Sequence, residues 1–198
     1  MPPSVRAVRR SGWLVWLLAA LVTVGLVAPA SYAAFSSRVS NSGNSLALGS
    51  VNLSDDDAGV ALLSLTNLKP GSSGSRCIAV TSTGTLASAV KLYATDTATT
   101  RGLASYITLA VTQGTGGTFG SCGGFAPLGS GSAVYSGTLA GFTGAATGYA
   151  NGVGSWTPSV NGSETRSFQF AYTVSSSVPD SAQGGTAAFG LTWEAQNT

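Results

Sequence analysis

The stretch SRCIAVTSTGTLASAVKLYA, residues 75–94, decides the fold class, because apolar residues alternate with polar or small ones along both of its halves. In the first half, Ile78 and Val80 fall on one face of an extended chain. After the break at TGT, Val90 and Leu92 again share a face, and the residues between them share the other. This period of two predicts two antiparallel strands, joined as a hairpin, with one buried face and one exposed face.

The same period recurs along the rest of the chain, and Gly, Pro and Ser turns separate the runs. Aromatic rows in the last two runs, from Phe168 to Val174 and from Ala187 to Ala195, are large enough to anchor a core. We expect no amphipathic helix after Phe35. The sequence therefore predicts an all-β fold, a two-sheet antiparallel sandwich of jelly-roll type with seven to eight strands. Beyond 75–94, the expected strands are 46–53, 60–68, 105–112, 133–142, 165–175 and 186–195.

The first 33 residues have the pattern of a secretory signal. Three arginines precede the apolar run WLVWLLAALVTVGLVA at 13–28, and the small-residue stretch APASYAAF follows it. We expect cleavage between Ala33 and Ala34, with a cut one residue later as a close variant. The alternative is an uncleaved N-terminal helix that anchors the protein in the membrane. The predicted organisation is a signal at 1–33, a flexible arm at 34–45 and one sandwich domain at 46–198.

Charge argues against several partners. The whole chain has a net charge of +2, but three of its nine basic residues lie in the predicted signal, which leaves six basic residues against seven acidic ones. A mature protein without a basic surface is a poor ligand for nucleic acid or for an anionic membrane. We therefore expect an extracellular protein that has no nucleic-acid partner and no membrane contact once the signal is removed.

The two cysteines, Cys77 and Cys122, both follow the predicted signal, and an oxidising environment permits a disulfide between them. Such a bond would tether the glycine-rich loop that contains Cys122 to the strand that contains Cys77. The alternative is two free or externally paired thiols.

Residues suited to catalysis are few. The chain contains no histidine, which removes the usual general base and the commonest metal ligand. A carboxylate pair could serve glycoside hydrolysis, but Asp96, Glu164, Asp180 and Glu194 are scattered along the chain. The run GTGGTFG at 114–120 lacks the spacing of a phosphate-binding loop. We expect that the protein is not an enzyme and that it binds no cofactor.

Three consecutive acids, Asp55, Asp56 and Asp57, are weak candidates for calcium, because hard cations bind clustered carboxylates in loops. Consecutive acids rarely converge on one ion, and the distal glutamate of an EF-hand is missing. A solvated turn is the alternative.

Four blocks in order carry a resemblance to a known family: SYAAF at 31–35, SNSGNSLALGSVNLS at 40–54, NLKPGSSGSRCIAVTSTGTLASAVKLYA at 67–94 and AFGLTWEAQ at 188–196. Together they resemble the camelysin/TasA family of secreted bacterial biofilm-matrix proteins, which carry signal peptides of the SipW-dependent type. The resemblance implies a jelly-roll domain, export through a dedicated signal peptidase and assembly into extracellular fibres. Camelysins are classed as metallopeptidases, yet this chain has no histidine to which a metal-ligand role could be transferred.

The sequence of the predicted arm at 34–45 suggests how fibres could assemble. In AFSSRVS, Phe35, Ser37 and Val39 alternate with polar residues, so the freed arm could add as a strand to the sheet edge of a neighbouring molecule. Alternatively, the arm covers the edge of its own domain.

Two other functions stay open. An extracellular carbohydrate-binding or adhesion module, with matrix polysaccharide as its partner, would use exposed aromatics, and Tyr93, Tyr149 and Trp156 are the candidates. A camelysin-type metallopeptidase is disfavoured by the missing histidine.

Overall fold

The computed structural model describes residues 49–63 and 68–198. The predicted signal at 1–33 and its cleavage position, the arm at 34–45 and its residues Phe35, Ser37 and Val39 lie outside the described residues. Within them no helix is long and apolar enough to span a membrane. The described strands are β1 (Leu53–Asp55), β2 (Ser73–Ser82), β3 (Ser88–Thr99), β4 (Ile107–Thr115), β5 (Ala126–Pro127), β6 (Ala133–Thr138), β7 (Val153–Trp156), β8 (Glu164–Val174) and β9 (Ala187–Asn197).

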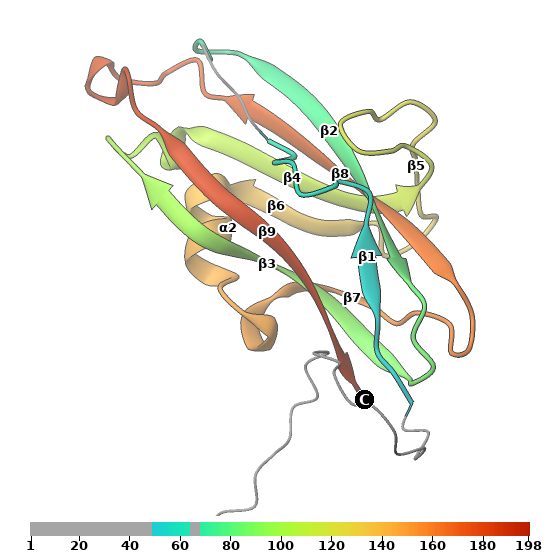
Figure 1. Cartoon of the computed structure of the whole chain (residues 1–198). Helices are drawn as coiled ribbons and strands as arrows, with labels where there is room; N and C mark the ends of the chain where they lie inside the picture. Colours follow the sequence, from blue (N-terminus) through green and yellow to red (C-terminus); the bar gives the residue numbers. More distant parts are fainter. Residues whose placement is uncertain (1–48, 64–67) are drawn as a thin grey trace, which may run out of the picture. The chain divides into compact units, whose positions relative to one another are not determined.

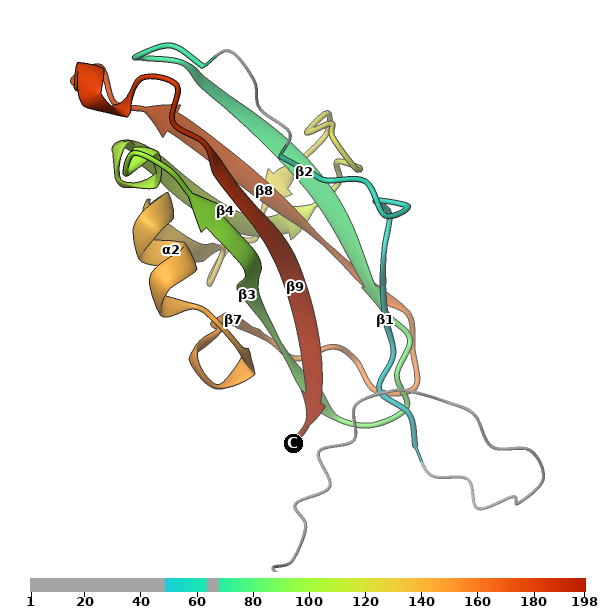
Figure 2. The ribbon, with the colours of Figure 1, turned by 60° about the vertical axis from the view of Figure 1, so that its left-hand side comes forward.

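The strands form two antiparallel sheets, which confirms the predicted all-β sandwich (Figure 1), although the described residues contain nine strands where seven to eight were predicted. Sheet A has the order β1-β2-β8-β4-β5, and β6 also pairs with β4. Sheet B has the order β7-β3-β9. Figure 2 shows sheet B in front of the long strands of sheet A, with helix α2 (Leu139–Ala145) beside β3. Three short 3-10 turns, Leu103–Tyr106, Tyr149–Asn151 and Asp180–Ala182, complete the described elements.

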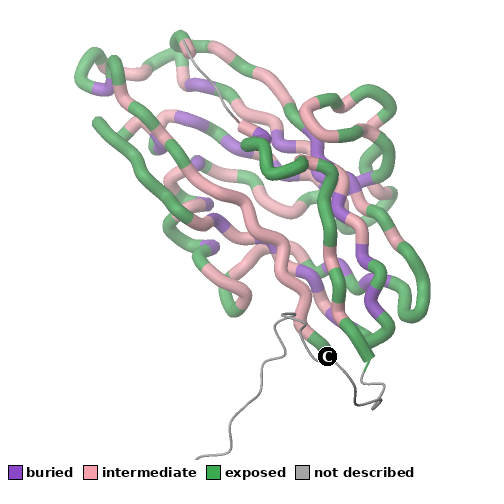
Figure 3. The backbone as a smooth tube through the Cα atoms, in the orientation of Figure 1, coloured by how far each residue is buried: buried purple, intermediate pink, exposed green. Residues whose placement is uncertain are grey.

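The core lies between the sheets, where the predicted faces meet. Ile78 and Val80 from β2, and Val90 and Leu92 from β3, are buried as the alternation predicted. Along β3 and β4, buried residues alternate with more exposed ones (Figure 3). Phe170 of β8 is fully buried and meets the ring of Trp193 from β9 edge-on, with the ring centroids 6.1 Å apart. The two aromatic rows therefore face each other across the core.

The predicted hairpin at 75–94 is wrong, although both of its strands exist. β2 pairs with β1 and β8 in sheet A, whereas β3 pairs with β7 and β9 in sheet B. The short connection after Ser82 therefore crosses from one sheet to the other. Both halves bury a face against the same core, and alternation alone does not distinguish two strands of one sheet from strands of opposite sheets.

Three other expectations need correction. Within the expected strand at 46–53, the described part is irregular until β1 begins at Leu53, and the first residues of the expected strand at 60–68, 60–63, form no strand. The run at 133–142 is a strand only as far as Thr138. Helix α2 then begins, because the Thr138 side chain accepts a hydrogen bond from the Gly141 N–H and so caps the first turn. Its buried Leu139 and Phe142 fill the core beside β3.

Candidate functional site

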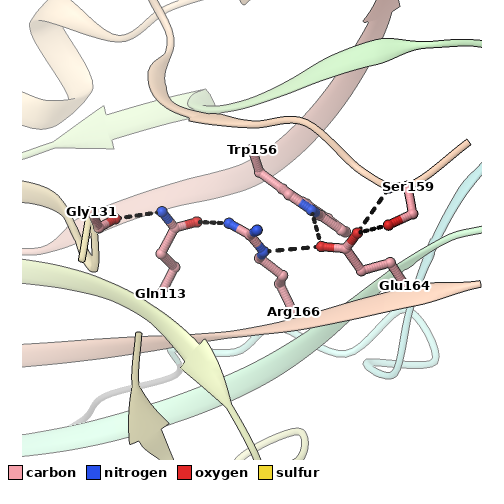
Figure 4. A network of polar contacts seen from close by, with 6 residues as sticks. All are labelled: Gln113, Gly131, Trp156, Ser159, Glu164 and Arg166. Atoms are coloured by element: carbon pink, nitrogen blue, oxygen red, sulfur yellow. Dashed lines mark hydrogen bonds and ion pairs between the residues drawn. The ribbon is translucent and has the colours of Figure 1, made fainter. Parts of the chain in front are cut away.

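A chain of polar contacts lies at one end of the sandwich and centres on Glu164, the first residue of β8 (Figure 4). Its Oε1 accepts hydrogen bonds from Trp156 Nε1 at 2.7 Å and from Arg166 Nε at 3.3 Å. Its Oε2 accepts from the backbone N–H and the hydroxyl of Ser159 at 2.8 and 2.9 Å. Glu164 thus joins sheet A to the last residue of β7 in sheet B and to the loop between them.

Arg166 extends this chain across sheet A. Its Nη1 donates to Gln113 Oε1 at 3.1 Å, and Gln113 Nε2 donates to the carbonyl of Gly131 at 2.6 Å. The guanidinium carbon also lies 5.4 Å from the centre of the Trp156 ring, within the range of a cation–π contact. None of the buried side-chain nitrogen and oxygen atoms of this network lacks a partner, which is the condition for a half-buried polar network to be stable.

Opposing effects set the pKa of Glu164. Burial raises it, but the hydrogen bonds from Ser159 and Trp156 and the positive charge of Arg166 lower it by more, so the pKa lies below its ordinary value. A carboxylate that stays ionised can only accept hydrogen bonds, and this property suits a structural role. A general acid would need the opposite shift.

Two of the other carboxylates considered for catalysis have partners of their own. Glu194 accepts from the hydroxyl of Tyr93 at 2.8 Å, and Asp180 accepts from Gln183 Nε2 at 2.7 Å. Asp96 lies where the register of β3 and β9 shifts between Thr95 and Ala98.

The acidic turn at Asp55, Asp56 and Asp57 is bonded to the protein itself. Asp57 Oδ1 accepts from the Gly59 N–H at 2.6 Å. Asp56 accepts from two distant amides: Oδ1 from Ala79 of β2 at 2.9 Å and Oδ2 from Phe119 at 2.8 Å. Burial and a hydrogen bond with Asp57 raise the pKa of Asp55. The calcium candidates thus include one residue, Asp56, that holds two parts of the chain together.

The disulfide between Cys77 and Cys122 is present, as predicted. It fixes the loop 116–125, which joins β4 to β5 and is yellow in Figure 1, to β2. We call this loop the flap. Cys77 is fully buried although its side chain lies on the face of β2 opposite Ile78 and Val80. The glycine-rich stretch, expected to be a surface loop, is thus tied to β2 by a covalent bond.

The three aromatics proposed for carbohydrate stacking do not form an exposed platform. Trp156 is only 2% exposed. Tyr93 donates its hydroxyl to Glu194, and Tyr149 donates to the carbonyl of Ala89 at 2.9 Å while its ring lies 5.0 Å from Lys91 Nζ. Trp156 therefore belongs to the core and the Glu164 network, and cannot stack on a sugar.

The sheet edges differ from one another. The edge strands β1, β5, β6 and β7 have three, two, six and four residues. β9 has eleven residues and, among the described parts of the chain, pairs with β3 alone. A long strand with one side open is the feature of this fold that is best suited to binding another extended chain.

These features define a disulfide-bonded two-sheet β-sandwich in which, among residues 49–63 and 68–198, one side of the long strand β9 is unpaired. Residues 14–102 match the model of a family described as camelysin metallo-endopeptidase. The resemblance to the camelysin/TasA family is therefore confirmed over this part of the chain. A comparison with curated proteins found no match.

The family description implies a metal ion, and the residues present do not fit one. All seven acids and both cysteines lie in the described residues, which contain no group of three or more such side chains that could hold a metal. We therefore derive no catalytic step from a metal.

Sequence reasoning missed the Glu164 network and the double role of Asp56. One signal for the network was available: Glu164 and Arg166 have the same parity as Phe168 in β8, and Gln113 has the same parity as Val111 in β4. Charged or amide residues on the core-facing side of a strand indicate buried polar partners. No local pattern linked Asp56 to the flap, because its two amide partners lie 23 and 63 residues away.

Proposed function

We propose that this chain is a secreted, non-catalytic structural protein that assembles into extracellular fibres by strand addition. The single observation that carries the proposal is the open edge of β9. The family resemblance, the predicted signal and the alternating arm at 34–45 support the same reading.

The β9 edge lacks the usual defences against strand pairing. Proteins blunt such edges with short strands, lysine, proline or bulges. The sequence of β9, AAFGLTWEAQN, contains no lysine and no proline, and its one charge is Glu194. From Ser88 to Thr95 its ladder with β3 runs without a shift in register. Eleven residues give enough length to bind an added strand through several main-chain hydrogen bonds.

The pairing of β3 shows which amides of β9 face this open edge. The Ala94 N–H donates to the carbonyl of Ala146, on the side of β3 away from β9. Ala94 is opposite Leu191, and in an antiparallel ladder both members of such a pair direct their N–H groups outward. By the period of two, Trp193 and Ala195 also direct their N–H groups to the open edge.

The proposed partner of this edge is the arm of a second copy. Phe35, Ser37 and Val39 would lie on one side of the added strand, and main-chain hydrogen bonds would supply the affinity. Before a signal peptidase cuts between Ala33 and Ala34, the signal would obstruct this pairing. Assembly would then wait for export to the cell surface or the biofilm matrix.

The proposal includes no catalysis, because the chain lacks histidine and the carboxylates of Glu164 and Glu194 accept hydrogen bonds from neighbouring side chains. Matrix polysaccharide is a further partner of the assembled fibre in this proposal. Binding of polysaccharide by the monomer would instead favour the carbohydrate-binding module.

The test compares protein that begins at Ala34 with protein that begins at Leu46 and with the Ala195→Pro variant of the first. Proline at position 195 removes an N–H at the open edge and none from the ladder with β3, as edge strands tolerate. Light scattering and electron microscopy should show filaments from the first protein and monomers from the other two.

Ala195→Ser is the matched control, because it changes the side chain and keeps the N–H. It should form filaments like the parent. Monomers from the Ala34 protein at high concentration would contradict the fibre proposal, and filaments from Ala195→Pro would show that β9 is not the edge used.

A further inference from the structure

The edge of sheet A at β2 is covered, in contrast to the edge of sheet B at β9. β1 pairs only with Val80 to Ser82, at the C-terminal end of β2. Next to it, the outward-facing N–H of Ala79 donates to Asp56 Oδ1 at 2.9 Å, and the outward-facing carbonyl of Cys77 accepts from the Gly120 N–H at 2.8 Å. The edge groups of Cys77 and Ala79 are thus bonded to a side chain and to a loop where a further strand would otherwise pair.

The flap that supplies Gly120 is held in place by two independent links. One is the disulfide between Cys77 and Cys122, and the other is the hydrogen bond from the Phe119 N–H to Asp56 Oδ2 at 2.8 Å. The flap also lies close to the disulfide: a Cβ added to Gly117 would be 3.3 Å from Cys77 Cβ. Neither link contributes to the β-ladders themselves.

We propose that Asp56 and the disulfide-held flap close a second self-association edge, at which β2 would otherwise pair with β2 of a second copy. When two identical edges pair in antiparallel fashion, a twofold axis relates them, so the product is a closed dimer. Residues 73–79 of β2 extend beyond β1, and seven residues are enough for such a pairing.

The closed β2 edge complements the fibre proposal, since it would leave β9 as the edge for strand addition. The inference does not depend on that proposal. It predicts a dimer through sheet A, whereas the fibre proposal predicts filaments through sheet B. To separate the two, the test uses protein that begins at Ala34 and carries Ala195→Pro, in which β9 assembly is blocked.

In that background, three variants are compared. The double variant Cys77→Ala/Cys122→Ala frees the flap from its covalent link. Asp56→Ala removes the hydrogen bonds to Ala79 and Phe119 and keeps the disulfide. Asp57→Ala is the matched control, because the Asp57 side chain has its partners, Gly59 and Asp55, within the acidic turn and does not bond to β2 or to the flap.

Hydrogen exchange and light scattering over a range of concentrations provide the readouts. We expect the Ala79 amide to exchange about tenfold faster in monomeric Asp56→Ala than in Asp57→Ala, since a lost hydrogen bond lowers local protection by about that factor. The double cysteine variant should form dimers whose β2 amides become protected as concentration rises. Asp57→Ala should stay monomeric.

Two results would overturn the inference. One is a folded double cysteine variant that stays monomeric at high concentration, and the other is an Ala79 amide that exchanges equally slowly in Asp56→Ala and Asp57→Ala. If the double variant does not fold, reduction of the folded parent with a dithiol reagent opens the same bond. The dimer is then expected in the reduced protein and must disappear on reoxidation.

Discussion

Replacing Glu164 with alanine should destabilise the fold by about 2–4 kcal/mol. The estimate follows from what the carboxylate leaves behind. Trp156 is buried, and its indole N–H would lose its hydrogen-bond acceptor, at a cost of about 1–3 kcal/mol. The two hydrogen bonds from Ser159 end on a charged acceptor, and such bonds are stronger than neutral ones. The Glu164 side chain is 26% exposed, so water will replace part of the lost hydrogen bonding, and the expected loss of stability is smaller than the sum over the separate bonds.

Urea unfolding followed by tryptophan fluorescence measures this loss, provided that the slope against denaturant stays unchanged. Glu194→Ala is the matched control. Glu194 is also a strand carboxylate with hydrogen-bond partners, but its donors, Tyr93 and Gln196, are only partly buried. We expect the control to lose about 1 kcal/mol or less. Glu164→Gln should fall between the two variants, because it keeps one carbonyl acceptor and removes the charge.

A loss below about 0.5 kcal/mol for Glu164→Ala would refute the reasoning, since a buried indole N–H without a partner must then cost almost nothing. Equal losses for Glu164→Ala and Glu194→Ala would also refute it. They would show that burial of the donor, on which the difference between the two sites rests, does not decide the energetic cost.

Other predictions concern pH, packing and backbone conformation. Because the pKa of folded Glu164 is lowered, its contribution to stability is complete above the ordinary carboxyl pKa and is lost as pH falls through the lowered value; urea midpoints should fall less with acid in Glu164→Gln than in the parent. Phe170→Ala should cost about 3–5 kcal/mol in urea unfolding, because a fully buried ring leaves a cavity. Gly117 and Gly120 both have positive φ, but only the Cβ at 117 would press on Cys77, so Gly117→Ala should lower the melting temperature more than Gly120→Ala.

The faces of the strands could be predicted from sequence, because burial of one face imposes a period of two on each strand by itself. Ile78, Val80, Leu109 and Val111 are buried as that rule requires. The partners of the strands could not be predicted in the same way. β2 pairs with β8, which begins more than 80 residues later, and nothing in the residues 75–94 distinguishes this pairing from a local hairpin.

The functional features differ in the same way: some could be predicted from the sequence, and those that depend on long-range contacts could not. The disulfide was predictable because only two cysteines exist, so one pairing was possible. The cover over β2 was not predictable, because it depends on Asp56 reaching two amides that only the folded chain brings together. Helix α2 was missed because seven residues are too few to show a helical period within a glycine-rich passage.

Because β1 lies close to β9, the arm could pair with β9 of its own molecule or with β9 of a neighbour, and the effect of protein concentration distinguishes the two. Some Cα atoms of β1 lie within 8 Å of β9, although the two strands belong to different sheets. Residue Ser50, just before β1, accepts a hydrogen bond from the Thr85 N–H, and the Ala87 carbonyl after this turn accepts from the N–H of Thr198, the residue that follows β9. The first described residues thus lie beside the C-terminal end of β9, so we expect the arm to pair either with its own β9 edge or with that of a neighbour. An arm on its own edge would protect the N–H groups of Leu191 and Trp193 at every dilution, whereas an arm donated to a neighbour would protect them only above the concentration at which filaments form. Hydrogen exchange across a dilution series therefore separates the two. Protection that is independent of concentration would leave the fibre proposal without its binding edge.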